Sequence, residues 1–286
     1  MLSITLDWLA FTYKENTHEM HDFMALYASD KNSHPATAYH GYSASYQTED
    51  GVICSWNDDR QEMGYHVVLG GSAIRALCTR KELSQETLLR EVIRSGASVT
   101  RLDLATDLRE VSIQLSSIWS ALESGHNRGS SRKFGQIVSN DGGHTIYVGS
   151  RQSEKFIRVY DKAAQEGLPQ ELWFRFEIET KGMVARALAK LLLDTGQWKN
   201  IFDGCALGMV DLRPNSSFEE FFRKGDVPIG VPKLERQTDR ERWIAEQVVA
   251  AVAKHYIENP YSSAVTRLID TLLLIAQQRG MGPYEK

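Results

Sequence analysis

Ionisable side chains alternate with apolar ones along three short segments, Val99–Asp107, Lys155–Lys162 and Trp173–Lys181. Successive side chains of a β-strand point to opposite faces, so each segment would form a strand with one polar and one apolar face. The residues that would share the polar faces are Arg101, Asp103, Asp107, Arg158, Tyr160, Lys162, Arg175, Glu177 and Glu179. If the strands adjoin in one sheet, these faces form a single pocket of carboxylates, cations and one phenol, which suits phosphate chemistry.

The remaining sequence predicts an α+β protein with a largely antiparallel central sheet and flanking helices. Residues 2–13 favour a first strand, and the aromatic, β-branched stretch Tyr39–Leu69 favours a meander of short strands closed by Gly70 and Gly71. Helical spacing, with capping residues at several ends, predicts further elements. The predicted helices are Thr17–Ser29, Ser84–Ser95 with Ser84 as N-cap, Ser112–Glu123 and Met183–Thr195.

The succession VTRLDLATDL, TIYVGSRQSEKFIRVYDK and WFRFEIETK resembles the Rep_trans family of rolling-circle replication initiators. The segments ITLDWLAFTYK and MGYHVVLGG are similar to the early strands of that family, so the resemblance covers roughly residues 1–185. It implies a site-specific DNA nickase and strand-transferase that initiates rolling-circle replication of a plasmid or phage. In that family a tyrosine becomes joined to the 5′ phosphate of the nicked strand, which releases a 3′ hydroxyl for a polymerase.

The resemblance makes Tyr160 the expected nucleophile, because RVYDK matches the tyrosine motif of the family. A phenol is mostly protonated at neutral pH, and Arg158 and Lys162 would supply positive charge on the same strand face. The alternative is that Tyr160 is an ordinary aromatic residue of a strand.

Asp103, Glu177 and Glu179 are the expected ligands of a Mg²⁺ or Mn²⁺ ion, since hard divalent cations prefer carboxylate oxygens and can polarise a scissile phosphate. Asp107, near the strand end, is a weaker fourth candidate. The alternative is that the carboxylates form ion pairs with arginines on a solvated face of the sheet.

Basic residues near the motifs are the expected contacts to single-stranded DNA, with Tyr147 or Phe134 available to stack on bases. These expected DNA-binding residues are Arg101, Arg151, Lys155, Arg175, Arg132 and Lys133. Arginines on the strands could clamp phosphate oxygens or equally hold the carboxylates in place. The loop cations could equally form a solvated basic loop.

Composition limits how the chain would contact DNA and where it would act. A net charge of −4 excludes a uniformly basic surface, so DNA contact would come from local patches and a metal. Three cysteines without CxxC spacing indicate a reducing, cytoplasmic location, and the resemblance implies that this is the cytoplasm of a bacterial host. No apolar segment is long enough to predict a membrane span. No GxxxxGK[ST] motif is present, so unwinding would need a host helicase.

The expected organisation is a nickase domain at 1–202, a loop-rich connection at 203–232 and a C-terminal helical region at 233–286. The helices expected there, about Asp239–Glu258 and Pro260–Arg279, have apolar stripes that would pack on the main domain, on each other or in a homodimer. Three other functions stay open at this point. They are a relaxase of a conjugative element, a non-catalytic DNA-binding replication regulator, and a metal nuclease that uses water instead of Tyr160.

Overall fold

The computed structural model describes residues 3–231 except 15, 16, 29–31, 39, 40, 141, 142, 169 and 223–227, together with Arg267. The chain divides into two compact units, residues 1–234 and 235–286. The two helices expected near the C-terminus therefore lie outside the described residues, apart from Arg267, which is helical.

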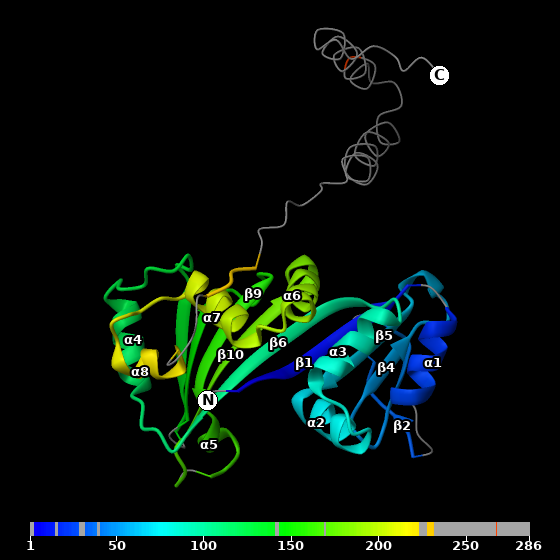
Figure 1. Ribbon diagram of the computed structural model, residues 1–286, viewed down its shortest axis with the longest axis horizontal. Helices are drawn as coiled ribbons and strands as arrows, with labels where there is room; N and C mark the ends of the chain where they lie inside the picture. The colour runs from blue at the N-terminus through cyan, green and yellow to red at the C-terminus, as the bar shows by residue number, and fades with distance from the viewer. Residues whose placement is uncertain are drawn as a thin grey trace. The chain divides into compact units, whose positions relative to one another are not determined.

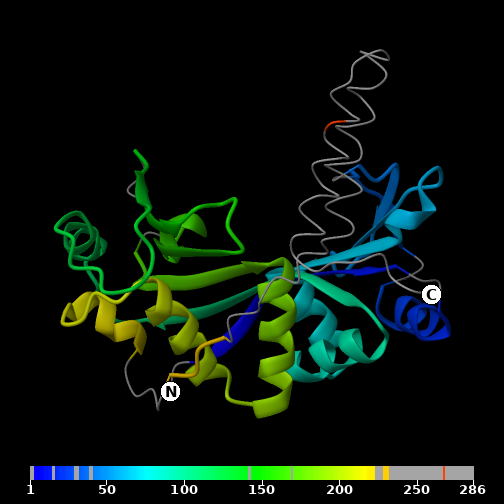
Figure 2. The ribbon, with the colours of Figure 1, turned by 90° about the horizontal axis from the view of Figure 1, so that it is seen from above.

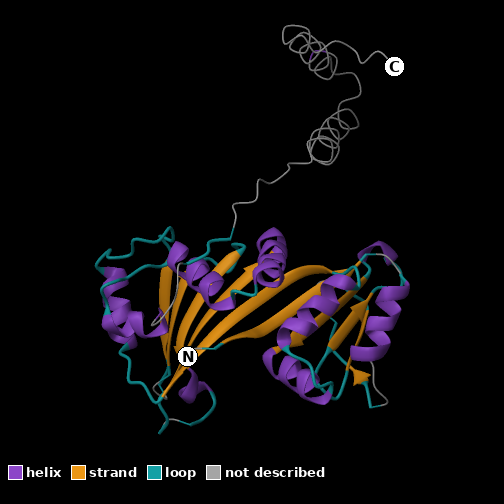
Figure 3. Ribbon diagram, in the orientation of Figure 1, coloured by secondary structure: helices purple, strands orange, loops and turns teal. Residues whose placement is uncertain are grey.

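The first unit is built on an antiparallel sheet of ten strands in the order β2-β3-β4-β5-β1-β6-β10-β9-β8-β7 (Figures 1 and 3). The strands are β1 (Ile4–Tyr13), β2 (His34–Pro35), β3 (Ala44–Gln47), β4 (Ile53–Trp56), β5 (Tyr65–Gly70), β6 (Ser98–Arg109), β7 (Phe134–Val138), β8 (His144–Gly149), β9 (Lys155–Asp161) and β10 (Trp173–Lys181). The predicted α+β class and the three motif strands are confirmed. In the sheet, β6, β10 and β9 are consecutive neighbours.

Helices connect and cover these strands. They are α1 (His18–Tyr27), α2 (Gly71–Arg80), α3 (Gln85–Arg94), α4 (Leu115–Glu123), α5 (Lys162–Gln165), α6 (Gly182–Thr195), α7 (Trp198–Met209) and α8 (Ser216–Glu219), with 3₁₀ turns η1 (Gln61–Met63) and η2 (Glu220–Phe222). The predicted N-cap is confirmed, because the Ser84 hydroxyl accepts a hydrogen bond from the backbone N–H of Thr87. No described helix has the length and apolar character needed to cross a membrane.

Two parts of the chain differ from the sequence expectations. α2 follows Gly70 directly where only a turn was predicted, and α7 extends to Met209, into the region predicted to be loop-rich. The glycines within α7 are the reason that a loop was predicted there, because a glycine in a helix interior normally reduces helix stability by about 1 kcal/mol relative to alanine. Gly204 is needed for close packing instead, since a Cβ there would lie 2.2 Å from the carbonyl oxygen of Ile229.

The apolar face of the central strands holds the core. Figure 2 shows α6 and α7 against one side of β6 and β10. Phe176 of β10 is fully buried on this side, and aromatic rings from α7, α8 and η2 surround it. These rings belong to Phe202, Phe218, Phe221 and Phe222, with centroids 5.4–6.3 Å from that of Phe176. Burial of this face leaves the opposite face of the same strands to carry the polar residues.

Candidate active site

Strand register places the polar residues in rows that cross the sheet. One row runs from β7 to β6 through Ile137, Thr145, Tyr160, Arg175 and Asp107, each paired with the next. The adjacent row contains Tyr147, Arg158 and Glu177, and the next contains Phe156, Glu179 and Asp103. The expected alternation is therefore real for these residues, and the three motif strands bring Tyr160, the predicted arginines and the carboxylates onto one face.

Tyr160 is the residue on which the candidate site is centred. Its phenol donates a hydrogen bond to Oε2 of Glu177 at 3.3 Å, and only 8% of the residue is exposed. Burial raises the pKa of the phenol, and the negative charge of Glu177 raises it further. Tyr160 is therefore protonated at neutral pH, and Glu177 is the carboxylate positioned to receive its proton.

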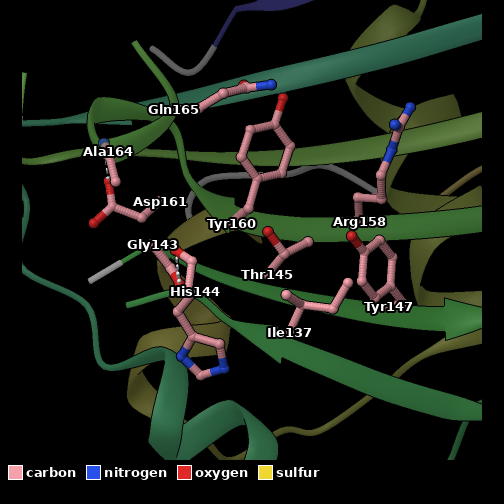
Figure 4. Close-up of a pocket in the computed structure, with 11 residues that line it drawn as sticks. Ile137, Gly143, His144, Thr145, Tyr147, Arg158, Tyr160, Asp161, Ala164 and Gln165 are labelled. Carbon is pink, nitrogen blue, oxygen red and sulfur yellow. Dashed lines mark hydrogen bonds between the residues drawn. The ribbon is translucent and has the colours of Figure 1, made fainter. Parts of the chain in front are cut away.

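The ring of Tyr160 lines a pocket between the β7–β8 hairpin, β9 and α5 (Figure 4). Other lining residues are Ile137, Thr145, Tyr147, Arg158 and Gln165. The tyrosine is thus buried at its edges but lines a space that a ligand can enter.

The three predicted metal ligands converge on one point. The Nη2 atom of Arg158 lies 3.8 Å from Oδ2 of Asp103 and 3.6 Å from Oε2 of Glu179, and it pairs closely with Oε1 of Glu177. All three carboxylates are at least nine-tenths buried, whereas the Arg158 side chain is 27% exposed. The Arg158 guanidinium supplies positive charge at this point, where three carboxylates so close together would otherwise repel one another.

Arg101 and Lys181 complete the charge balance at the other end of the cluster. Arg101 donates hydrogen bonds to both oxygens of Asp103 and to Oε2 of Glu179 at 2.8 Å, and Lys181 pairs with Oε1 of Glu179 at 2.6 Å. Burial raises the pKa of Asp103 to about 7, although its bonds to Arg101 act in the opposite direction. Burial likewise raises the pKa of Glu177.

Arg175 is held in a separate pair of salt bridges. Its guanidinium contacts Asp107 at 2.7 Å and Asp7 of β1 at 2.6 Å, and its side chain is 6% exposed. Burial acts to raise the pKa of Asp107, but the hydrogen bonds and the positive charge of Arg175 together lower it, so Asp107 is held ionised. Sequence reasoning missed Asp7, which lies at a register shift between Leu6 and Trp8 where β1 pairs with β6. A lone acid within the apolar run ITLDWLAF was the available signal.

The structure divides the expected DNA-binding residues into two groups. Arg101 and Arg175 are engaged with buried carboxylates, which favours the alternative in which they hold those carboxylates in place. Arg132, Lys133 and Arg151 are exposed at or near the ends of the β7–β8 hairpin. Lys155 begins β9 and is half-buried.

Lys162 differs from its expected position. The prediction placed it on the strand face beside Tyr160, but β9 ends at Asp161, whose side chain caps α5 by accepting a hydrogen bond from Ala164 N–H. Lys162 is the first residue of α5 and pairs with Glu166 at 2.5 Å. The strand parity used for Lys162 is therefore wrong, because the Asp161 cap turns the chain into a helix one residue earlier.

The carboxylate trio offers the oxygen donors that a hard divalent cation prefers, and these oxygens come from β6 and β10. In the described part of the chain, no three acidic, histidine or cysteine residues are arranged as an open metal site, since the Arg158 and Arg101 guanidinium groups lie between the oxygens. The predicted ligands are thus gathered together and also ion-paired, but on a buried and not on a solvated face of the sheet.

The chain, with a ten-stranded antiparallel sheet that carries a tyrosine and a carboxylate cluster on its polar face, is similar to known proteins in sequence and in fold. Residues 97–223 match the Rep_trans family model, described as replication initiation factor, which confirms the resemblance over all three motif strands.

Two particular proteins are similar to the chain. The DNA relaxase NicK of Bacillus subtilis (strain 168) is 28% identical over 199 residues, which cover 64% of this chain and 54% of the relaxase. The chain thus spans about half the length of that curated relative. A solved rolling circle replication initiator protein from Geobacillus stearothermophilus shares the fold with a TM-score of 0.64 and 21% identity, covering 78% of this chain and 91% of that structure.

Proposed function

We propose that this protein nicks single-stranded DNA at a specific site and transfers the strand through Tyr160, and that it thereby initiates rolling-circle replication of a plasmid or phage. The observation that carries the proposal is the hydrogen bond from the Tyr160 phenol to Glu177 beside an accessible pocket. Similarity to a replication initiator and to a relaxase supports DNA as the substrate.

In the proposed step, the Tyr160 oxygen attacks the scissile phosphorus while its proton passes to Oε2 of Glu177. A bond forms between the phenolic oxygen and the 5′ phosphate, and the bond from phosphorus to the 3′ oxygen of the neighbouring nucleotide breaks. That oxygen takes up a proton to become a 3′ hydroxyl, so one proton is moved and no redox partner is needed. Strand transfer is the reverse attack by a 3′ hydroxyl on the phosphotyrosine.

Asp103, Glu179 and Oε1 of Glu177 would hold Mg²⁺ or Mn²⁺ in place of the Arg158 guanidinium that lies between them, and the ion would polarise the scissile phosphate when bound. The two oxygens of Glu177 then have separate roles, because Oε2 faces Tyr160 and Oε1 faces the point where the carboxylates converge. Arg158 lies on the same face as Tyr160 and would neutralise charge on the phosphate during attack.

The partners follow from the chemistry. Origin DNA would be single-stranded at the nick, a host helicase would unwind the duplex, and a host polymerase would extend the 3′ hydroxyl in the cytoplasm. The match to the relaxase supports a second candidate function, nicking for conjugative transfer, which uses the same covalent step.

The covalent step can be tested without knowing the origin. Purified protein is incubated with Mn²⁺ and a pool of random single-stranded oligonucleotides, and protein–DNA adducts are isolated on denaturing gels and sequenced. Tyr160→Phe should abolish the adduct, whereas Tyr13→Phe, at a buried tyrosine of β1 bonded to Ser95, should retain it. An undiminished adduct from Tyr160→Phe would exclude this nucleophile, and cleavage without adduct in the wild type would indicate attack by water.

Glu177→Gln keeps the shape of the side chain but removes the proton acceptor. On a substrate recovered from that selection, we expect adduct formation to slow by about 100-fold or more, in the range for loss of a general base. A rate equal to that of the wild type would show that Glu177 does not receive the proton.

A further inference from the structure

The pocket beside Tyr160 has an aromatic wall that the proposed cleavage step does not use. Tyr147 of β8 lines this pocket, and its ring stacks on Phe156 of β9 with centroids 5.7 Å apart and planes 17° apart. The guanidinium of Arg151 lies 5.4 Å from the centroid of Tyr147 and 5.7 Å from that of Phe156. Two parallel rings with a cation over them form a surface on which a flat, electron-rich ring can stack.

The strand next to Tyr147 leaves space for such a ring. Gly135 of β7 pairs with Tyr147, and a Cβ placed on Gly135 would meet no atom within 4 Å. Its φ is outside the left-handed region, so the backbone does not require glycine at this position. Two residues further along the same face, Ile137 lines the pocket and is 57% exposed. The absence of a side chain at Gly135 thus extends the open space alongside the Tyr147 ring.

We infer that this pocket is a nucleobase-binding subsite for single-stranded DNA, in which one base stacks on Tyr147 and occupies the space over Gly135. The inference takes single-stranded DNA as the substrate from the proposed function. It adds that this pocket recognises one nucleotide near the scissile phosphate. The pocket suits a nucleobase better than a purely apolar ligand, because Gln165 and Thr145 also line it and can hydrogen-bond to base edges.

Charge around the pocket agrees with a nucleic-acid ligand. The loop that carries Arg132 and Lys133 adjoins the end of β8, where the N–H of Gly149 donates a hydrogen bond to the carbonyl oxygen of Lys133. Both residues are exposed, as is Arg151 beyond β8. Arg158 lines the pocket itself and Arg151 lies over the Tyr147 ring, so a strand whose base enters the pocket would have these cations close to its phosphates. A stacking surface with nearby cations is the combination that binds single strands.

The test uses a probe that binds whether or not it is cut, an oligothymidylate 12-mer with one central 2-aminopurine. Quenching of the 2-aminopurine reports stacking, and fluorescence anisotropy of an end label reports total binding. Tyr147→Leu removes the ring and Gly135→Leu fills the space beside it, whereas Tyr147→Phe keeps the ring. Val138→Leu is the matched control, because Val138 is 63% exposed and lies on the opposite face of β7 from Gly135.

We expect quenching in the wild type, Tyr147→Phe and Val138→Leu, and its loss in Tyr147→Leu and Gly135→Leu with roughly tenfold weaker binding. Equal quenching in all variants, or binding of the probe by the wild type without quenching, would overturn the subsite. Absence of probe binding by the wild type would overturn it as well. Because Tyr160→Phe should still quench the probe, failure of the covalent chemistry and failure of the subsite give different results.

Discussion

The two faces of β6 and β10 have opposite characters although they belong to the same strands. On one face, Leu102, Leu104, Phe176 and Ile178 are fully buried beneath α6, α7 and the turns that follow. On the other face, the alternate residues form a buried network of carboxylates and arginines around Tyr160. The apolar face stabilises the fold because it buries apolar surface area away from water. On the polar face, removing charges from water has a desolvation cost, which the ion pairs between those charges offset.

This difference agrees with the proposed function, in which the polar face serves chemistry and not stability. Buried ion pairs often contribute little net stability compared with apolar residues of the same volume, while loss of one partner is strongly destabilising. Stability measurements on variants of the two faces, compared with variants outside both, can test this interpretation.

The largest effect on stability is expected on the apolar face. Phe176→Ala should reduce the free energy of unfolding by about 3–5 kcal/mol, because it leaves a cavity among four aromatic rings. Phe134→Ala on the edge strand β7 is the matched control and should cost about 1 kcal/mol, since Phe134 is 39% exposed and contacts Trp119 only edge-on. Urea unfolding followed by circular dichroism measures both, and equal losses would contradict the assignment of the core to the aromatic cluster around Phe176.

The second effect concerns the polar face. Arg175→Met should cost about 3 kcal/mol, because Asp7 and Asp107 would lose the cation that lies between them. Addition of Asp107→Asn to this variant should recover part of the loss, since one unpaired charge is then removed. Arg128→Met, at an ion pair whose arginine is 60% exposed, should cost under about 1 kcal/mol. Additive losses in the double variant would show that no unpaired charge is responsible.

The smallest effect is expected at an ion pair outside both faces. Hydrogen bonds from Arg213 lower the pKa of Asp211 to about 2, although partial burial acts in the opposite direction. A lowered pKa stabilises the fold above the unfolded value near 4, and this stabilisation is lost as the pH falls from about 4 to about 2. Asp211→Asn should therefore cost no more than about 1 kcal/mol at neutral pH, and the cost should vanish near pH 2. A cost that persists at low pH would point to lost packing instead.

The alternation of residue types determined much of the architecture. Period-two patterns identified the motif strands within two residues of their observed ends, and Ser84 marked the start of α3. The same patterns put Tyr160 and Arg158 on one face with Glu177, because parity along a strand is a local property. The predicted strand position of Lys162 was wrong because the Asp161 side chain caps a helix that begins there. The part of α7 beyond residue 202 was missed because Gly204 packs against Ile229, a contact that local sequence patterns do not reveal.

Sequence alone therefore determined which side chains share a strand face, since that depends only on backbone geometry. Tertiary structure decided which strands are neighbours, and with that the pairing of Asp7 with Arg175, the hydrogen bond from Tyr160 to Glu177 and the space beside Tyr147. These contacts join residues up to 168 positions apart in the chain. Their distances follow from strand order and register, which depend on packing of the whole sheet and not on any local pattern.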